Sequence, residues 1–200
     1  IPQIINEKGE ITTTDINFQE YENLDFLKYE GPTEPTITGG LNNLLTWKNW
    51  RLNLFLTYSF GNKIRLDPVF SAAYSDMSAM PKEFKNRWVQ PGDENITSVP
   101  AIASVRQYQN DTNLRYAYNA YNYSSERVAD GGFIRLKNVS LSYDLPKSLI
   151  TKIGLTTASP KLDATNLWLI YADDKLNGQD PEFVNSGGVA TPMPKQFTFT

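Results

Sequence analysis

The sequence predicts an all-β fold built from antiparallel strands. Two long stretches, residues 131–146 and 50–60, alternate apolar and polar side chains with a period of two, the pattern of a strand whose two faces have different surroundings. The chain contains no run close to the ~18 to 20 consecutive apolar residues of a membrane helix. The alternation fits two architectures: a soluble β-sandwich, and the wall of a transmembrane β-barrel with lipid on one side and a polar lumen on the other.

Residues 1–35 are predicted to form a connecting turn. The stretch is polar, and Pro32 and Pro35 interrupt any continuous strand. Residues 6–10 are similar to part of a calcium-binding loop, but Lys8 stands where a ligand would be needed and the glycine is misplaced. A solvated turn is therefore the prediction.

Residues 36–60 are predicted to form a β-hairpin that turns at residues 47–49. The second strand keeps Arg51 away from its apolar face, which fixes the register because an arginine facing lipid at the midplane costs roughly 2 to 4 kcal/mol. Aromatic residues collect at both strand ends, as in the interfacial girdles of a membrane barrel. The predicted girdle residues are Trp47, Trp50, Tyr58 and Phe60, joined by Tyr143 from the strand within residues 131–146.

Residues 61–131 are predicted to be a long loop in which only residues 82–89 favour a short helix. A run of tyrosines in this loop lies among asparagines and glutamines. Tyrosine combines a flat apolar face with a hydroxyl group, which suits stacking on sugars or anchoring a protein partner, although packing of the loop onto its own barrel is the default use of aromatic side chains. The candidate binding residues are Tyr108, Tyr116, Tyr118, Tyr121 and Tyr123.

Residues 132–200 are predicted to supply three further strands. After Tyr143, residues 146–155 favour a turn with one helical turn closed by Gly154. The next strand, residues 161–171, changes the parity of its apolar side chains, which a β-bulge near Asn166 would reconcile.

A loop at residues 173–192 then leads to a final strand over residues 194–200, with Phe197 and Phe199 predicted to face outward. Five strands cannot close a barrel, and both ends of the chain look cut, since Thr200 stops an alternating strand. We therefore expect the chain to be a fragment of a longer protein.

Composition excludes several classes of function. The 200 residues include no cysteine and no histidine, so thiolate metal sites and Ser-His-Asp triads are not available within them. The net charge is −3 with scattered basic residues, so nucleic acid is not an expected partner, and no cofactor is predicted. A glycosidase with two carboxylates stays as an alternative without a recognisable spacing; its candidates are Asp67, Asp93, Glu94, Asp173, Asp174, Asp180 and Glu182.

Several segments, taken together and in order, resemble one known family. They are residues 35–63, the Asn-Arg-Trp to Pro-Gly-Asp box at residues 86–93, the run GGFIRLKNVSLSYDLP with the following Lys-Ser-Leu at residues 131–149, Ala-Thr-Asn-Leu-Trp at 164–168, and Gly-Gln-Asp-Pro-Glu at 178–182. This series resembles the C-terminal barrel strands of the SusC/RagA family of TonB-dependent outer-membrane transporters.

The resemblance implies that these are C-terminal antiparallel strands of a large transmembrane β-barrel in the bacterial outer membrane, in contact with its lipid. Residues 61–131 and 173–192 would be extracellular loops. The protein would not be an enzyme; it would import glycans or peptides with a SusD-like surface lipoprotein as a lid, and the five tyrosines would contact substrate or lid. TonB would act through a segment outside this chain. Barrels of this kind usually finish on an aromatic residue, so ending on Thr200 fits a truncated chain. A soluble, surface carbohydrate-binding β-sandwich module is the alternative.

Overall fold

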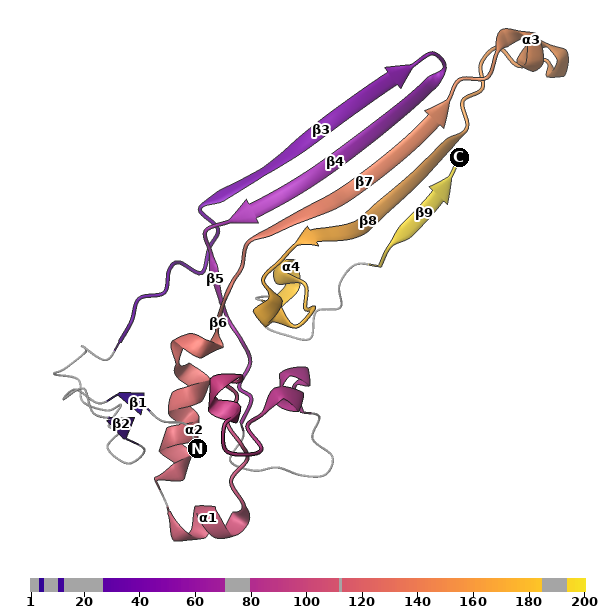
Figure 1. Ribbon diagram of the computed structural model, residues 1–200. Coiled ribbons are helices and arrows are strands. Elements are labelled where there is room, and N and C mark those ends of the chain that lie inside the picture. Colours follow the sequence, from indigo (N-terminus) through magenta and orange to yellow (C-terminus); the bar gives the residue numbers. More distant parts are fainter. Residues whose placement is uncertain (1–3, 6–10, 13–26, 71–79, 112, 185–193) are drawn as a thin grey trace. The chain divides into compact units, whose positions relative to one another are not determined.

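The computed structural model describes residues 4–5, 11–12, 27–70, 80–111, 113–184 and 194–200 (Figure 1). The chain divides into two compact units. The sheet unit comprises Gly31–Ile64 and Asp130–Thr200, and the helical unit comprises Ile1–Glu30 and Arg65–Ala129.

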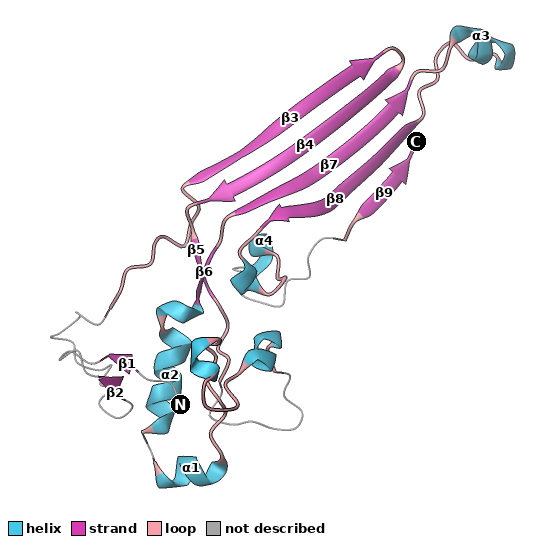
Figure 2. Cartoon of the chain, in the orientation of Figure 1, coloured by secondary structure: helices cyan, strands magenta, loops and turns pink. Residues whose placement is uncertain are grey.

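A five-stranded antiparallel sheet forms the body of the sheet unit (Figure 2). Its strand order is β3 (Ile37–Trp47), β4 (Trp50–Phe60), β7 (Phe133–Tyr143), β8 (Lys161–Tyr171) and β9 (Gln196–Phe199). Each strand pairs antiparallel with its neighbours. The predicted hairpin and the three later strands are confirmed, with bounds within two residues of those expected.

The β3–β4 hairpin turns through Lys48 and Asn49, because Trp47 pairs directly with Trp50. Lys48 has a φ of 51°, the left-handed conformation that two-residue hairpin turns require. A turn this short fixes the register of every following pair, up to Ile37 opposite Phe60.

The register gives the sheet an apolar face and a polar face, because side chains of paired residues lie on the same side. The predicted alternation of β4 is confirmed in its pairing with β7: Leu54 pairs with Val139 on the apolar face, and Asn53 pairs with Ser140 on the polar face. The edge strand β3 alternates less cleanly, since Asn43 lies on the apolar face and Leu44 on the polar face.

Two irregularities interrupt the ladder between β7 and β8. The register shifts between Leu136 and Asn138 and again between Ile134 and Arg135. The first shift lies opposite Asn166, whose φ of 53° departs from strand geometry, so the predicted bulge near Asn166 is confirmed.

The β7–β8 connection contains α3 (Lys147–Ile150) and a 3₁₀ turn at Thr151–Ile153, as the sequence predicts. Gly154 ends it with a φ of 76°. Its N–H donates to the Thr151 carbonyl at 3.2 Å, and the Leu155 N–H donates to the Ile150 carbonyl at 3.1 Å. These two bonds make a Schellman cap, in which glycine adopts the left-handed conformation at no steric cost.

Short elements complete the sheet unit. The β8–β9 connection carries a 3₁₀ turn at Asp174–Leu176 and α4 (Pro181–Val184). A separate two-stranded sheet pairs β5 (Lys63–Arg65) with β6 (Val128–Asp130), the two strands in which the division between the units falls.

The helical unit has its own small core. The unit contains β1 (Ile4–Ile5), β2 (Ile11–Thr12), α1 (Val105–Asn110), α2 (Leu114–Tyr123) and 3₁₀ turns at Lys82–Asn86, Asp93–Asn95 and Ser125–Arg127. The helix predicted over residues 82–89 is thus shorter than expected: Arg87 is extended and the Trp88 N–H donates to the Val99 carbonyl at 2.8 Å. The prediction of an irregular loop is wrong for α1 and α2, whose many tyrosines and asparagines are weak helix formers and concealed the helical period. Residues 6–10, with the similarity to a calcium loop, lie outside the described residues. Among the described segments, no helix is long and apolar enough to cross a membrane.

Candidate functional site

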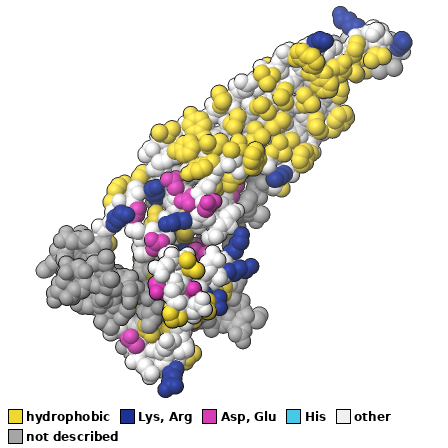
Figure 3. All heavy atoms as spheres, viewed as in Figure 1, with side chains coloured by type: hydrophobic (Ala, Val, Ile, Leu, Met, Phe, Trp, Pro, Cys, Tyr) yellow, Lys and Arg dark blue, Asp and Glu magenta, His cyan; other side chains and the backbone are white. Residues whose placement is uncertain are grey.

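The apolar face of the sheet carries continuous rows of side chains. Figure 3 shows hydrophobic side chains covering this sheet across its strands. Leu41, Trp168 and Phe197 on this face are all exposed. The middle rows are Leu45–Leu52–Leu141–Leu162–Phe199, Asn43–Leu54–Val139–Ala164–Phe197 and Leu41–Leu56–Leu136–Trp168.

The first and last rows, at the two ends of the strands, carry aromatic side chains. Trp47, Trp50 and Tyr143 form one end row, in which the Trp50 and Tyr143 ring centroids lie 4.6 Å apart. At the other end, Tyr58 stacks on Phe60 at 6.1 Å. Tyr171, which the sequence analysis did not assign to a girdle, lies 6.3 Å from Phe60.

The spacing between the two aromatic ends fits a bilayer. From Trp50 to Tyr58 the strand rises about 27 Å at about 3.4 Å per residue. A strand tilt of about 40° reduces this to about 20 Å along the membrane normal, close to the ~25 Å apolar band of outer-membrane barrels. The structure thus brings the five predicted girdle residues to two levels of the sheet, and their place at membrane interfaces stays a prediction.

The polar face is linked by side-chain hydrogen bonds and ion pairs. Asn138 donates to one oxygen of Asp163 at 2.7 Å, and Lys161 pairs with the other at 2.7 Å. Phe55 is the large apolar residue predicted on this face, and its ring lies over Gly40, where a Cβ would be 2.9 Å from the ring. The absence of a side chain at Gly40 makes room for Phe55.

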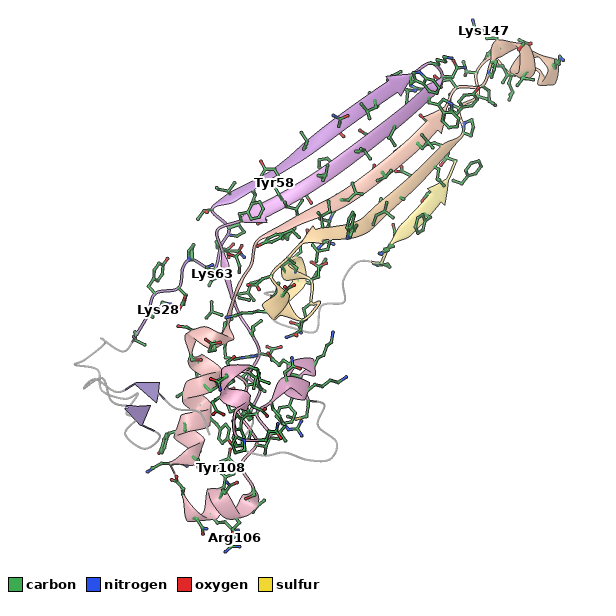
Figure 4. All side chains as sticks on the ribbon, in the orientation of Figure 1. Lys28, Tyr58, Lys63, Arg106, Tyr108 and Lys147 are labelled. Carbon is green, nitrogen blue, oxygen red and sulfur yellow. The ribbon has the colours of Figure 1, made fainter. Side chains whose placement is uncertain are left out.

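Ion pairs tie the β8–β9 connection to β7. Arg135 is buried, and its guanidinium contacts Asp180 at 2.5 Å and Glu182 at 3.2 Å. Asp173 accepts a hydrogen bond from the Asp130 N–H at 2.7 Å. Burial is the largest single influence on the pKa of the Asp130 carboxyl and would raise it, but the hydrogen bonds from Lys63 and the Gly132 N–H and the charge of Lys63 together lower it. Figure 4 shows Lys63 and Tyr58 near the same end of the sheet.

The helical unit separates the five candidate tyrosines into two groups. Tyr118 and Tyr121 are buried, with 3% and 7% exposure, and pack against Phe70 at centroid distances of 4.6 and 5.7 Å. The Tyr118 hydroxyl donates to the Ala101 carbonyl at 2.5 Å, and Tyr108 packs at the edge of this core. Burial raises the pKa of the Tyr121 hydroxyl. These three tyrosines supply packing for their own unit.

Tyr116 and Tyr123 instead point to solvent, with 41% and 64% exposure. They are seven residues apart on α2, so they lie on one face of the helix about 10 Å apart along its axis, with exposed Asn119 between them. The guanidinium of Arg65 lies 5.7 Å from the Tyr123 ring. We call Tyr116, Asn119 and Tyr123 the tyrosine stripe.

Two buried polar residues that the sequence analysis missed hold the helical unit together. The Asn122 side chain accepts from the Val69 and Phe70 N–H groups at 3.1 and 3.3 Å and donates to the Phe70 carbonyl at 2.9 Å. Arg127 pairs with Glu83 at 2.6 Å and donates to the Asp67 carbonyl. The signal for Asn122 was its position on the buried face of α2, four residues after Tyr118.

Five of the seven candidate carboxylates of the glycosidase alternative have structural partners. Asp93 accepts from the Val89 and Gln90 N–H groups, both at 3.0 Å. A hydrogen bond from the Trp88 indole, with others from backbone N–H groups, lowers the pKa of Glu94. Asp173, Asp180 and Glu182 serve the β8–β9 connection. Within the described residues, no cluster of three acidic side chains could hold a metal ion.

No family model matches the chain, but individual relatives do. TonB-dependent receptor P3 of Formosa agariphila is 32% identical over 178 residues, covering 89% of this chain and 15% of the relative. TonB-dependent receptor P39 of the same organism is 26% identical, covering 77% of this chain and 14% of the relative. The chain thus spans about one seventh of the length of these curated relatives.

Solved structures have the same fold. A RagAB peptide transporter superposes with a TM-score of 0.53 at 25% identity, covering 77% of this chain and 15% of that chain. A RagAB peptide importer in the open-open state superposes at 0.51 with 24% identity, covering 78% of this chain and 15% of that chain.

The chain is therefore an all-β fragment with the fold of a TonB-dependent transporter barrel. The chain belongs to the TonB-dependent receptors and is of the SusC/RagA type. Receptors of this family are not enzymes, so the glycosidase alternative is rejected.

Proposed function

We propose that this chain is part of an outer-membrane transporter of a Gram-negative bacterium, which imports peptides or glycans with energy supplied through TonB. The observation that carries the proposal is the apolar face of the sheet, bounded by aromatic rows at both ends and backed by a polar face. A soluble β-sandwich would bury such a face against a second sheet, whereas no described segment of the sheet unit covers Leu41, Trp168 or Phe197.

Peptides are the favoured substrate class, because the solved structures that superpose are a peptide transporter and a peptide importer. Glycans remain the second class. A SusD-like surface lipoprotein is the expected lid. The tyrosine stripe is the part of the helical unit best suited to contact substrate or lid, because its two rings are exposed while Tyr118 and Tyr121 are occupied in the core.

The membrane position of the sheet is tested with spin labels in the full-length protein in vesicles. Single cysteines replace Leu54 on the apolar face and Asn53 on the polar face. We expect oxygen, which partitions into lipid, to relax the label at Leu54, and a water-soluble nickel chelate to relax the label at Asn53. A label at Leu54 shielded from both reagents would mean a soluble core and would overturn the proposal.

Transport is tested by uptake of labelled peptide and oligosaccharide pools into cells that express the full-length protein. We expect peptide uptake that disappears when TonB is deleted. Tyr116→Ala combined with Tyr123→Ala should reduce uptake or lid association several-fold, since an exposed aromatic anchor contributes strongly to binding. Tyr118→Phe is the matched control, because it changes a core tyrosine and leaves the stripe intact. Uptake unaffected by TonB deletion would contradict the transport proposal.

A further inference from the structure

The end of the sheet with the Trp47–Trp50–Tyr143 row also presents exposed lysines. Lys48 lies in the β3–β4 turn, with its ammonium 5.1 Å from the Trp47 ring centroid. Lys147 and Lys152 lie in α3 and the following 3₁₀ turn. Figure 3 shows basic side chains at this end of the sheet, and Figure 4 places Lys147 on α3.

The β7–β8 connection presents positive charge because its one carboxylate is paired with an arginine. Residues 144–160 contain a single carboxylate, Asp144, and its oxygen lies 2.5 Å from the Arg51 guanidinium. A hydrogen bond from Ser159, together with Arg51, lowers the pKa of Asp144. The lysine ammonium groups are therefore left as the charges that this connection presents to its surroundings.

The same connection exposes apolar side chains. Leu149 is 55% exposed and Leu155 is 46% exposed, while Ile150 between them is buried. The Schellman cap at Gly154 sets the direction in which the chain leaves the helical turn at Leu155. Exposed lysine and exposed leucine alternate along this connection, in the order Lys147, Leu149, Lys152 and Leu155. This is the pattern of a segment that lies at a membrane surface.

Hydrogen bonds hold the connection as a continuation of the barrel wall. The Asp144 N–H donates to the Asn49 carbonyl at 2.8 Å, and the Leu145 N–H donates to the Ala158 carbonyl at 3.0 Å. The helical turn therefore starts only four residues beyond Tyr143, the last residue of the aromatic row. A surface that continues the lipid-facing wall past its girdle meets the lipid headgroups.

We propose that residues 144–160 form an interfacial anchor that binds anionic phospholipid, with Leu149 and Leu155 among the acyl chains and Lys147, Lys152 and Lys48 on the phosphates. The leaflet is the periplasmic one, since short strand connections mark the periplasmic end of outer-membrane barrels and the β3–β4 turn has two residues. This inference rests on the proposed membrane position of the sheet.

The anchor is tested in the full-length protein in phosphatidylcholine vesicles with and without about one quarter phosphatidylglycerol. A spin label replaces Leu149, and matched labels replace the neighbouring exposed Ser148 and the wall residue Leu54. With the anionic lipid, we expect the ratio of oxygen to nickel accessibility at Leu149 to exceed that at Ser148 and to approach that at Leu54. Lys147→Gln combined with Lys152→Gln, or about 0.5 M salt, should lower the Leu149 ratio to its value in pure phosphatidylcholine.

The possible outcomes test the anchor and the membrane position of the sheet separately. A label at Leu149 that stays in water in both vesicles, while the Leu54 label reports lipid, overturns the anchor alone. A Leu149 label shielded from both reagents would show that protein covers the connection and would also overturn the anchor. A Leu54 label without lipid contact overturns the proposed membrane position itself.

Discussion

At the scale of single residues, Gly39 and Tyr58 show how the sheet fits an aromatic end row. They pair across β3 and β4, and a Cβ built at Gly39 would lie 2.6 Å from Cζ of the Tyr58 ring. The ring therefore covers the glycine, a known way of stabilising a glycine in a sheet. We expect Gly39→Val to displace Tyr58 and to destabilise the refolded full-length barrel by about 1 to 3 kcal/mol, the usual cost of overpacking.

Denaturant titration in vesicles measures this cost. In a Tyr58→Ala background the same Gly39→Val change should cost much less, because the ring that clashes with the new side chain is gone. Equal costs in both backgrounds would show that the glycine is needed for another reason.

Asp144 gives the barrel a dependence on pH. Its pKa is lowered by the hydrogen bond from Ser159 and by Arg51. A carboxyl whose pKa is lower in the folded state stabilises that state above its unfolded pKa, and the contribution disappears as the pH falls through the folded pKa. The stabilisation by Asp144 should therefore be complete above about pH 5 and be lost below about pH 4.

The measurement compares unfolding midpoints of the wild type and Asp144→Asn in the full-length protein. We expect the wild type to be more stable at pH 7 and the difference to shrink towards pH 3. A difference that stays constant over this range would mean that Asp144 acts as a hydrogen-bonding group without regard to its charge.

At the scale of elements, Asn122 fastens α2 to the segment of Val69 and Phe70. Asn122→Ala leaves two buried N–H groups and one carbonyl without partners, which should cost about 2 to 4 kcal/mol. Asn119→Ala is the matched control on the exposed face of the same helix and should change stability by less than about 0.5 kcal/mol. Hydrogen exchange at the Val69 and Phe70 amides reports the effect directly. Similar protection in both variants would contradict this role for Asn122.

The elements also show where sequence reasoning succeeds and fails. The clean alternation of β4 sufficed to place its two faces, because one strand with a period of two determines its own orientation. The helix α2 carried a comparable signal, with Leu114, Ala117, Tyr118 and Tyr121 at helical spacing, and all four are buried. Its tyrosines and asparagines are weak helix formers, so composition concealed the period.

The same limit applies to the candidate site. All five tyrosines look alike in sequence, and only the helical period separates Tyr116 and Tyr123 from the core residues Tyr118 and Tyr121. Phe55 is an exception to the polar side chains on its face of β4, and the sequence alone does not explain it. The structure does, because the Phe55 ring lies over Gly40. Contacts between distant segments, such as Arg127 with Glu83, leave no local pattern at all.

At the scale of the whole molecule, the apolar band and its aromatic ends predict a depth profile for charge along β4. Leu54 lies in the central row of the apolar face, and Tyr58 lies in an end row. In a bilayer, an arginine costs roughly 2 to 4 kcal/mol at the midplane and roughly 0 to 1 kcal/mol near the interfaces. Leu54→Arg should therefore lower the unfolding free energy of the full-length barrel in vesicles by the larger amount. Tyr58→Arg should cost the smaller amount together with the loss of the ring contacts with Phe60 and Gly39.

Asn53→Arg provides the control for the neighbouring position, because Asn53 lies opposite Ser140 in the strand register, on the polar face of the sheet. We expect it to cost clearly less than Leu54→Arg. The ranking of these stability costs depends on what surrounds the sheet. If the apolar face were exposed to water, an arginine at Leu54 would be tolerated as well as one at Tyr58. Equal costs for arginine at Leu54 and Tyr58 would show that the apolar face does not lie in a bilayer. A cost that falls from Leu54 to Tyr58 requires that the rows span the bilayer.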